Sequence, residues 1–246
     1  MKKGILTATV LVALSAGAAI AGVNPGSGIV GSAHDMNSFG TDLTADTQGR
    51  VCAFCHTPHH ALVDPTGEQQ PLWSHTFTTQ NYKPYASPTL NQIIDPTDVL
   101  KGPSRLCMSC HDGLIAADQH YGSPDVGGST GRLNNDLWNG VAIGKVDGSG
   151  QGNLSNDHPI GFAYTPVATN DTGIFNAAGR KFLGNPTGPT IADVLTDGFM
   201  TCATCHDVHN KDNVTNTGGR NYFVYGPQQG SQLCLTCHAK GSETKI

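Results

Sequence analysis

The pattern of hydrophobic and polar positions predicts little regular structure in this chain. Residues 121–153 are rich in Gly, Asn, Asp and Ser, and such a segment predicts loops. Hydrophobic positions cluster only in short stretches elsewhere. They predict short helices at residues 112–117 and 191–195, and short strands at residues 141–143 and 222–225. Residues 22–50 show no periodicity and are interpreted as an extended arm.

The first residues have a different pattern, typical of a secretory leader. Lys2 and Lys3 precede an apolar run at residues 5–20, which ends in a small-x-small cleavage site at residues 19–21. The alternative is a membrane anchor that is retained. The run is short for a membrane span, so we expect residues 1–21 to be removed and the chain to be exported.

Composition argues against a conventional core. Hydrophobic residues make up 37% of the 246 residues and aromatic ones 7%, whereas there are 31 Gly and 14 Pro. Such a chain either stays disordered or packs around something that supplies apolar surface. The formal charge is −5, and loss of Lys2 and Lys3 leaves 12 basic and 19 acidic residues, or −7. Because there is no basic cluster, we do not expect a nucleic-acid partner.

The cysteine pattern suggests what supplies that surface. All eight cysteines fall in four C-x-x-C-H motifs. Zinc sites and redox disulfides also use C-x-x-C pairs, but they tolerate any next residue. Histidine at all four positions arises by chance roughly a few times in a million, so the motifs indicate c-type haem attachment. The predicted attachment residues are Cys52, Cys55, Cys107, Cys110, Cys202, Cys205, Cys234 and Cys237, and the proximal iron ligands are His56, His111, His206 and His238.

Each iron then needs a second axial ligand. Seven histidines remain (His34, His59, His60, His75, His120, His158 and His209). Of the methionines beyond the leader, Met108 lies inside a motif and Met200 adjoins one, which leaves Met36 as the one free methionine. We therefore expect four bis-histidine haems, whose closed irons suit electron transfer rather than substrate binding.

The distal candidates follow from a repeat. The first and third motifs share C-x-x-C-H-x-x-H, whereas the second and fourth share L-C-x-[S/T]-C-H. On a short helix the last histidine of the long form lies one turn from the proximal one, so it reaches a neighbouring haem. This nominates His59 and His209, with His60 as the alternative to His59. The isolated histidine upstream of each half nominates His34 and His158. His75 and His120 are expected not to be ligands.

The same repeat divides the chain. After the leader, residues 22–246 are expected to form a single tetrahaem domain of two dihaem modules, at about 22–120 and 121–246. The distances between motifs differ, at 55 residues from Cys52 to Cys107 and 32 from Cys202 to Cys234, so the modules are not copies in detail.

These residues resemble the doubled-CxxCH multihaem c-type cytochromes, in particular the tetrahaem outer-surface cytochromes of metal-reducing bacteria, some of which polymerise into extracellular filaments. The resemblance is carried by residues 51–59, 71–73, 106–113, 157–160 and 202–209. It implies a mostly coil chain with a few short helices and minimal strand, wrapped around a stack of four haems. In filament-forming members an N-terminal histidine ligates a haem of the next subunit, and here His34 holds the corresponding position.

Three functions are compatible with these features. The expected one is a non-enzymatic electron-transfer subunit of a conductive filament, outside the cell or at the outer cell surface, that passes electrons from other redox proteins to external acceptors. The alternatives are a monomeric periplasmic shuttle and a multihaem reductase with one open iron.

Overall fold

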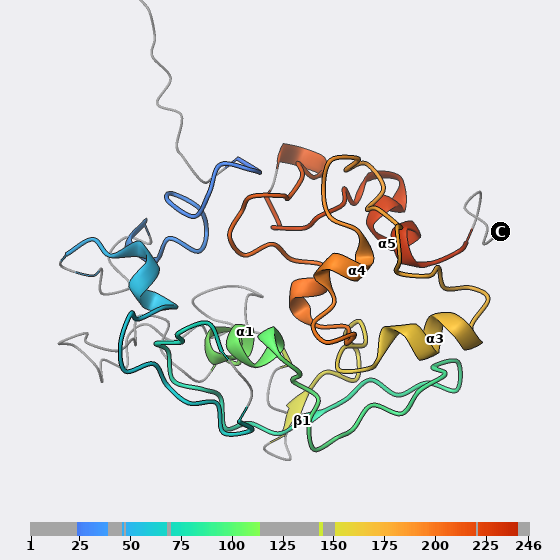
Figure 1. Cartoon of the computed structure of the whole chain (residues 1–246), viewed down its shortest axis with the longest axis horizontal. Coiled ribbons are helices and arrows are strands. Elements are labelled where there is room, and N and C mark those ends of the chain that lie inside the picture. The colour runs from blue at the N-terminus through green and yellow to red at the C-terminus, as the bar shows by residue number, and fades with distance from the viewer. Residues whose placement is uncertain are drawn as a thin grey trace, which may run out of the picture.

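The computed structural model describes residues 24–38, 46, 48–67, 70–113, 143–144, 151–219 and 221–240. Turns and irregular segments dominate this part of the chain (Figure 1). Its helices are α1 (Pro103–His111), α3 (Tyr164–Asn170), α4 (Ile191–Val194) and α5 (Gln232–Cys237), and its strands are β1 (Tyr82–Lys83) and β2 (Gly152–Asn153). Single 3-10 turns are η1 (Met36–Ser38), η3 (Val51–Phe54), η4 (Cys202–Thr204), η5 (Thr217–Gly219) and η6 (Gln229–Ser231). The prediction of a mostly coil chain with few short helices and minimal strand is confirmed.

One of the two predicted helices lies where it was expected. The helix predicted at residues 191–195 is α4, and its start is fixed by a capping box in which Asp193 N donates to Thr190 Oγ1 (3.3 Å) and Thr190 N to Asp193 Oδ2 (2.9 Å). The prediction of a helix at residues 112–117 is wrong where it can be checked. Gly113, with φ of 72°, lies in the left-handed region and follows the end of α1, and residues 114–117 are outside the described part.

The helix in that region is instead α1, which carries the second motif itself. Pro103 occupies its first turn, where a missing N–H does no harm, and Gly102 caps it with φ of 47°. The predicted strand at residues 141–143 is described only at Ile143, which is not in a strand.

Two strands that the sequence did not predict join distant parts of the chain. β1 and β2 pair in parallel, with Tyr82 opposite Gly152. A side chain at Gly152 would meet the Tyr82 ring at 2.4 Å, so glycine is needed at this contact.

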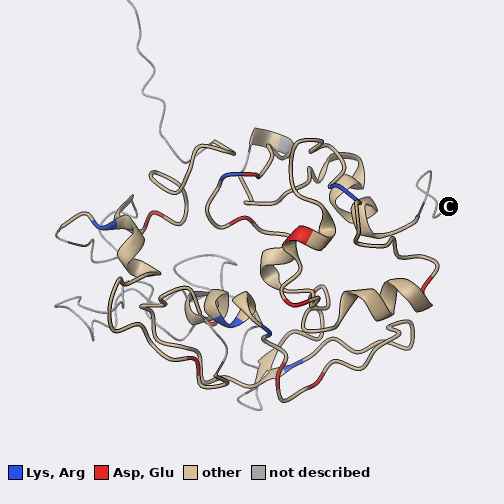
Figure 2. Cartoon of the chain, viewed as in Figure 1, with Lys and Arg blue, Asp and Glu red and all other residues tan. Residues whose placement is uncertain are grey.

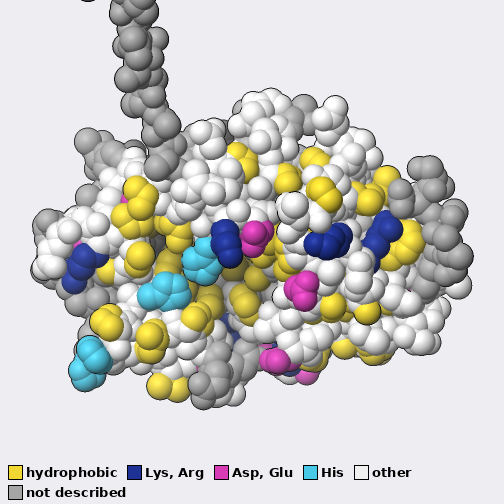
Figure 3. Space-filling model, turned by 45° about the horizontal axis from the view of Figure 1, so that its top comes forward, with side chains coloured by type: hydrophobic (Ala, Val, Ile, Leu, Met, Phe, Trp, Pro, Cys, Tyr) yellow, Lys and Arg dark blue, Asp and Glu magenta, His cyan; other side chains and the backbone are white. Residues whose placement is uncertain are grey.

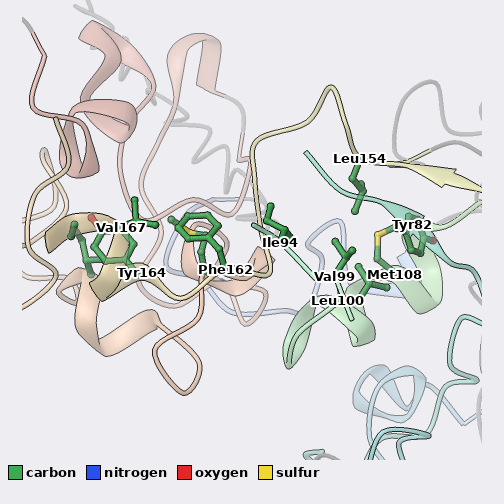
Figure 4. Close-up of a cluster of buried hydrophobic side chains, with 12 residues drawn as sticks. Tyr82, Ile94, Val99, Leu100, Met108, Leu154, Phe162, Tyr164 and Val167 are labelled. Carbon is green, nitrogen blue, oxygen red and sulfur yellow. The ribbon is translucent and has the colours of Figure 1, made fainter. Parts of the chain in front are cut away.

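The largest hydrophobic cluster is shared by both predicted modules. Figure 4 shows it as a row of side chains from Tyr164 and Val167 of α3 to Met108 of α1 and to Tyr82 and Leu154. Its members are Tyr82, Ile94, Val99, Leu100, Met108, Leu154, Phe162, Tyr164, Val167, Ala168, Ile191 and Met200.

The N-terminal arm does not extend freely but lies against the loop that follows the third motif, at Asn210 and Asn213. The blue segment in Figure 1 runs beside the orange chain that follows η4. Gly28 N donates to Asn210 O (3.0 Å), and the Asn210 amide donates to the carbonyl oxygens of Asn24 (3.2 Å) and Gly28 (2.8 Å). Gly26 N donates to Asn213 Oδ1 (2.8 Å). These bonds connect segments of the chain that are more than 180 residues apart in the sequence.

Charged side chains are few and scattered over the described part of the chain (Figure 2). Arg105 lies between two carboxylates, with Asp98 at 2.9 Å and Asp64 at 3.4 Å. Among the described residues, no helix is both long and apolar enough to cross a bilayer.

Candidate haem-attachment site

The first motif is a tight turn that fixes its proximal histidine. The backbone N–H groups of Cys55 and His56 both donate to Cys52 O, at 3.2 and 2.8 Å, as the chain leaves η3. The Nδ1 atom of His56 lies 2.5 Å from Pro71 O. Because a carbonyl oxygen only accepts, Nδ1 carries the proton, and Nε2 keeps the lone pair that an iron needs.

The third motif repeats this arrangement. Cys205 N and His206 N donate to Cys202 O at 3.2 and 3.1 Å, and His206 Nδ1 lies 2.9 Å from Tyr222 O. Its imidazole therefore has the same tautomer as that of His56. The sequence repeat is thus also a repeat of hydrogen bonds, and it orients two proximal ligands.

The segments that accept these bonds are themselves equivalent. Each forms an antiparallel bridge to its motif, His56 with Trp73 and His206 with Val224. In each segment the residue before the bridge has a left-handed backbone, with φ of 55° at Leu72 and 58° at Phe223. Residues 222–225, predicted as a strand or a haem-packing segment, form this support with one isolated bridge at Val224 and not with a strand.

The second and fourth motifs are built on helices instead. α1 ends at His111, and α5 ends just before His238, whose N–H donates to Cys234 O at 2.9 Å. The two cysteines of each motif are three residues apart, so on a helix they lie on the same side. Both thiols of a motif can therefore reach the same bound group.

Cysteines of different motifs also meet. α1 packs against η4, and Cys202 N donates to Ser104 Oγ at 3.1 Å. The Cys107 thiol donates to the Cys202 sulfur, and this lowers the pKa of Cys202 and raises that of Cys107. Burial raises the pKa of Cys110 to about 12. No cysteine of the chain is in a disulfide.

Three of the four proximal histidines face a second imidazole ring. The ring centres are 6.3 Å apart for His56 and His209, with planes 9° from parallel. They are 6.4 Å apart for His34 and His111, at 71°, and 6.3 Å apart for His158 and His238, at 76°.

These separations fit an iron between the rings. A metal–imidazole nitrogen bond is about 2 Å long and the ring centre lies about 1 Å beyond, so two imidazoles on opposite sides of one metal have centres about 6 Å apart. Three of the four nominated distal histidines, His34, His158 and His209, thus lie opposite a proximal histidine. His209 belongs to the third motif but faces the first. Its position does not come from a helix, because η4 ends at Thr204 and residues 205–209 lie in turns and irregular chain.

His34 is enclosed within its own chain. Burial, with the nearby His111, His206 and His209, lowers the pKa of His34 to about 4. Its Nδ1 atom is buried and has no hydrogen-bond partner. The docked arm holds the ring there, so the structure pairs the N-terminal histidine with His111 of the same chain.

The other histidines are placed differently. His59 and His60 are exposed on the loop after the first motif. His206 is also exposed, and within the described part of the chain no histidine ring faces it as in the three pairs above. His75 is fully buried, with Nε2 3.5 Å from Cys110 Sγ, so it belongs to the surroundings of the second motif. His120 lies outside the described residues. In Figure 3, histidine and hydrophobic side chains lie next to each other around a hollow near the middle of one face.

Sequence reasoning missed the supporting residues. Pro71 and Tyr222 contribute only backbone carbonyls, which any residue has, so no side-chain pattern marks them. The buried Trp73 indole beside His56 was visible only as an aromatic residue near a motif.

Comparison with known families agrees with the motif chemistry. Residues 194–243, which hold the third and fourth motifs, match the family model described as "Doubled CXXCH motif". No curated protein matches the chain. The paired motif supports a multihaem c-type cytochrome, and the CXXCH motifs imply covalently bound c-type haem.

Proposed function

We propose that the chain transfers electrons through four covalently bound, bis-histidine c-type haems and that it assembles into an extracellular filament. The observation that carries the redox part is the set of three histidine pairs whose ring centres are 6.3–6.4 Å apart. The haem supplies one-electron redox chemistry when bound. The protein holds each iron between two imidazoles and thereby closes it to substrate.

We assign the distal ligands on the basis of these pairs. His209 serves the first-motif haem, His34 the second and His158 the fourth. Mass spectrometry of the exported protein is expected to give four haem masses per chain. Its absorption and electron paramagnetic resonance spectra are expected to be those of low-spin haem iron. A chain with fewer haems would overturn the count of four.

The described part of the chain supplies no second ligand for the third-motif haem. His206 is exposed and has no facing histidine in the described part, and His59, which corresponds to His209 in the repeat, is exposed just after the first motif. Within one chain His56 already faces His209. We assign His59 of a second copy to the third-motif haem. A contact of His59 in one copy with His206 in the next, repeated from copy to copy, is heterologous and builds a head-to-tail chain.

Exposed hydrophobic side chains support contact between copies there. Val63 and Leu72, on the loop that follows the first motif, are 84% and 53% exposed, and Tyr222, which holds His206, is 38% exposed. Burial of such side chains favours association. The N-terminal leader and the resemblance to outer-surface cytochromes support export to the cell surface and electron delivery to external acceptors.

Electron microscopy of the purified protein tests assembly directly. His59→Gln is expected to abolish filaments and to leave one haem per chain that binds carbon monoxide. The matched control is His60→Asn, which also replaces an exposed histidine and suits the left-handed backbone there (φ 58°). Filaments of normal length from His59→Gln would reject this ligand, and an entirely low-spin His59→Gln monomer would show that the third haem is completed internally.

The lack of a histidine facing His206 in the described part also favours a second candidate, a reductase that uses an open third-motif haem. This function requires the iron to stay open in the assembled protein. Carbon monoxide or nitrite binding by wild-type filaments would favour the reductase, whereas binding only by the His59→Gln protein would favour the electron carrier.

A further inference from the structure

The indole of Trp73 is the buried polar group whose surroundings best indicate a ligand. Its side chain is 7% exposed, and its Nε1 atom is buried without a hydrogen-bond partner. Buried indole N–H groups nearly always have an acceptor, because an unmade bond leaves the desolvation penalty uncompensated. In this chain the group that can supply one is the haem of the neighbouring motif.

The position of Trp73 agrees with this. Trp73 pairs with His56 in an antiparallel bridge, and their ring centres are 6.3 Å apart at 88°. It packs with Phe77 and Leu106, and Cys55 lies against the same cluster. The indole is therefore next to both an attachment cysteine and the proximal histidine of the first motif.

The chemistry of haem selects the acceptor. The edge of the macrocycle is apolar except for two propionate side chains, whose carboxylates accept hydrogen bonds. A bond from a neutral donor to a carboxylate is stronger than one between neutral groups. We infer that Trp73 Nε1 donates a hydrogen bond to a propionate of the first-motif haem and thereby raises the reduction potential of that haem. The inference rests on haem attachment to the first motif, as proposed above.

The repeat gives this bond a functional meaning. Val224 occupies the position of Trp73 in the bridge to His206 and has no side-chain donor. The first-motif and third-motif haems are held by equivalent backbone bonds but differ at this point. Trp73 thus makes the reduction potentials of the first-motif and third-motif haems unequal. Identical surroundings in the two repeats would not do so.

The test measures the potential of the first-motif haem in the assembled protein. Its two imidazole planes are nearly parallel (9°), unlike the 71° and 76° of two other pairs, so its electron paramagnetic resonance signal is distinguishable during a redox titration. At about pH 8, where a carboxyl group is ionised, Trp73→Phe is expected to lower this potential, because the carboxylate charge is no longer partly offset. Phe77→Leu, in the same cluster, is expected to leave it unchanged.

The outcomes separate the alternatives. An unchanged potential in Trp73→Phe, or an equal shift in Phe77→Leu, overturns the inference, because packing would then explain everything. A wild-type chain with no haem on Cys52 and Cys55 would instead overturn the proposed function. If Trp73→Phe fails to mature, a second variant serves. The chain has two tryptophans, so Trp138→Phe leaves Trp73 as its one indole. Ultraviolet resonance Raman spectroscopy of this variant reports the N–H of Trp73, and a frequency typical of a free N–H overturns the inference.

Discussion

At the scale of single residues, the position of His209 links the third motif to the first. It follows the third proximal histidine by three positions, yet its ring faces His56 of the first motif at 6.3 Å. His209→Ala is therefore expected to open the first-motif haem, not the third. The measurement is electron paramagnetic resonance: the signal of the parallel pair should be lost while the signals of the near-perpendicular pairs remain. Loss of a near-perpendicular signal instead would contradict the pairing.

The residues of this site differ in how well the sequence predicts them. Cysteines and proximal histidines can be read directly, because covalent attachment and iron ligation require fixed spacing. The short distance from His206 to His209 indicates a ligand for a neighbouring haem, but the choice of the first motif depends on long-range folding. The bond from His56 to Pro71 O is invisible in the sequence, because every residue has a carbonyl group.

At the scale of elements, the N-terminal arm acts as a support for His34. Its hydrogen bonds to Asn210 cross most of the sequence, so local pattern could not predict them. Asn210→Gly keeps a residue that accepts the left-handed φ of 54° and removes the amide. Loss of such buried bonds is expected to cost about 1–3 kcal/mol locally. Hydrogen exchange of residues 24–38 should then accelerate, whereas Asn91→Gly, at an exposed site, should have no effect on it.

The contact between Gly161 and Val99 is a second junction between segments. Gly161 has φ of 80°, and a Cβ there would lie 2.4 Å from Val99 O. Gly161→Ala is expected to destabilise the fold by more than the 1–2 kcal/mol or so of a left-handed alanine. Gly198→Ala is the matched control, because its φ is 82° and nothing lies within 4 Å of the added carbon. Equal losses in thermal unfolding would show that the backbone at Val99 moves away.

At the scale of the whole molecule, the halves share one core, and a histidine of one half faces a histidine of the other. Ile94 and Val99 of the first module pack in the cluster of Phe162 and Tyr164 of the second, and His209 of the second faces His56 of the first. The sequence repeat indicates two modules but not this interdependence, because periodicity along a chain does not report contacts between its periods.

Shared packing predicts one cooperative unfolding transition. If neither half keeps its ligands and core without the other, haem absorbance and the hydrogen exchange of each half should change at the same temperature. Gly161→Ala should shift all three probes together, by about 2–4 °C for each kcal/mol in a chain of this size. Two separated transitions, with Gly161→Ala moving only one, would mean that the modules fold independently. In that case the 6.3 Å pair of His56 and His209 would open before the pairs that lie within single modules.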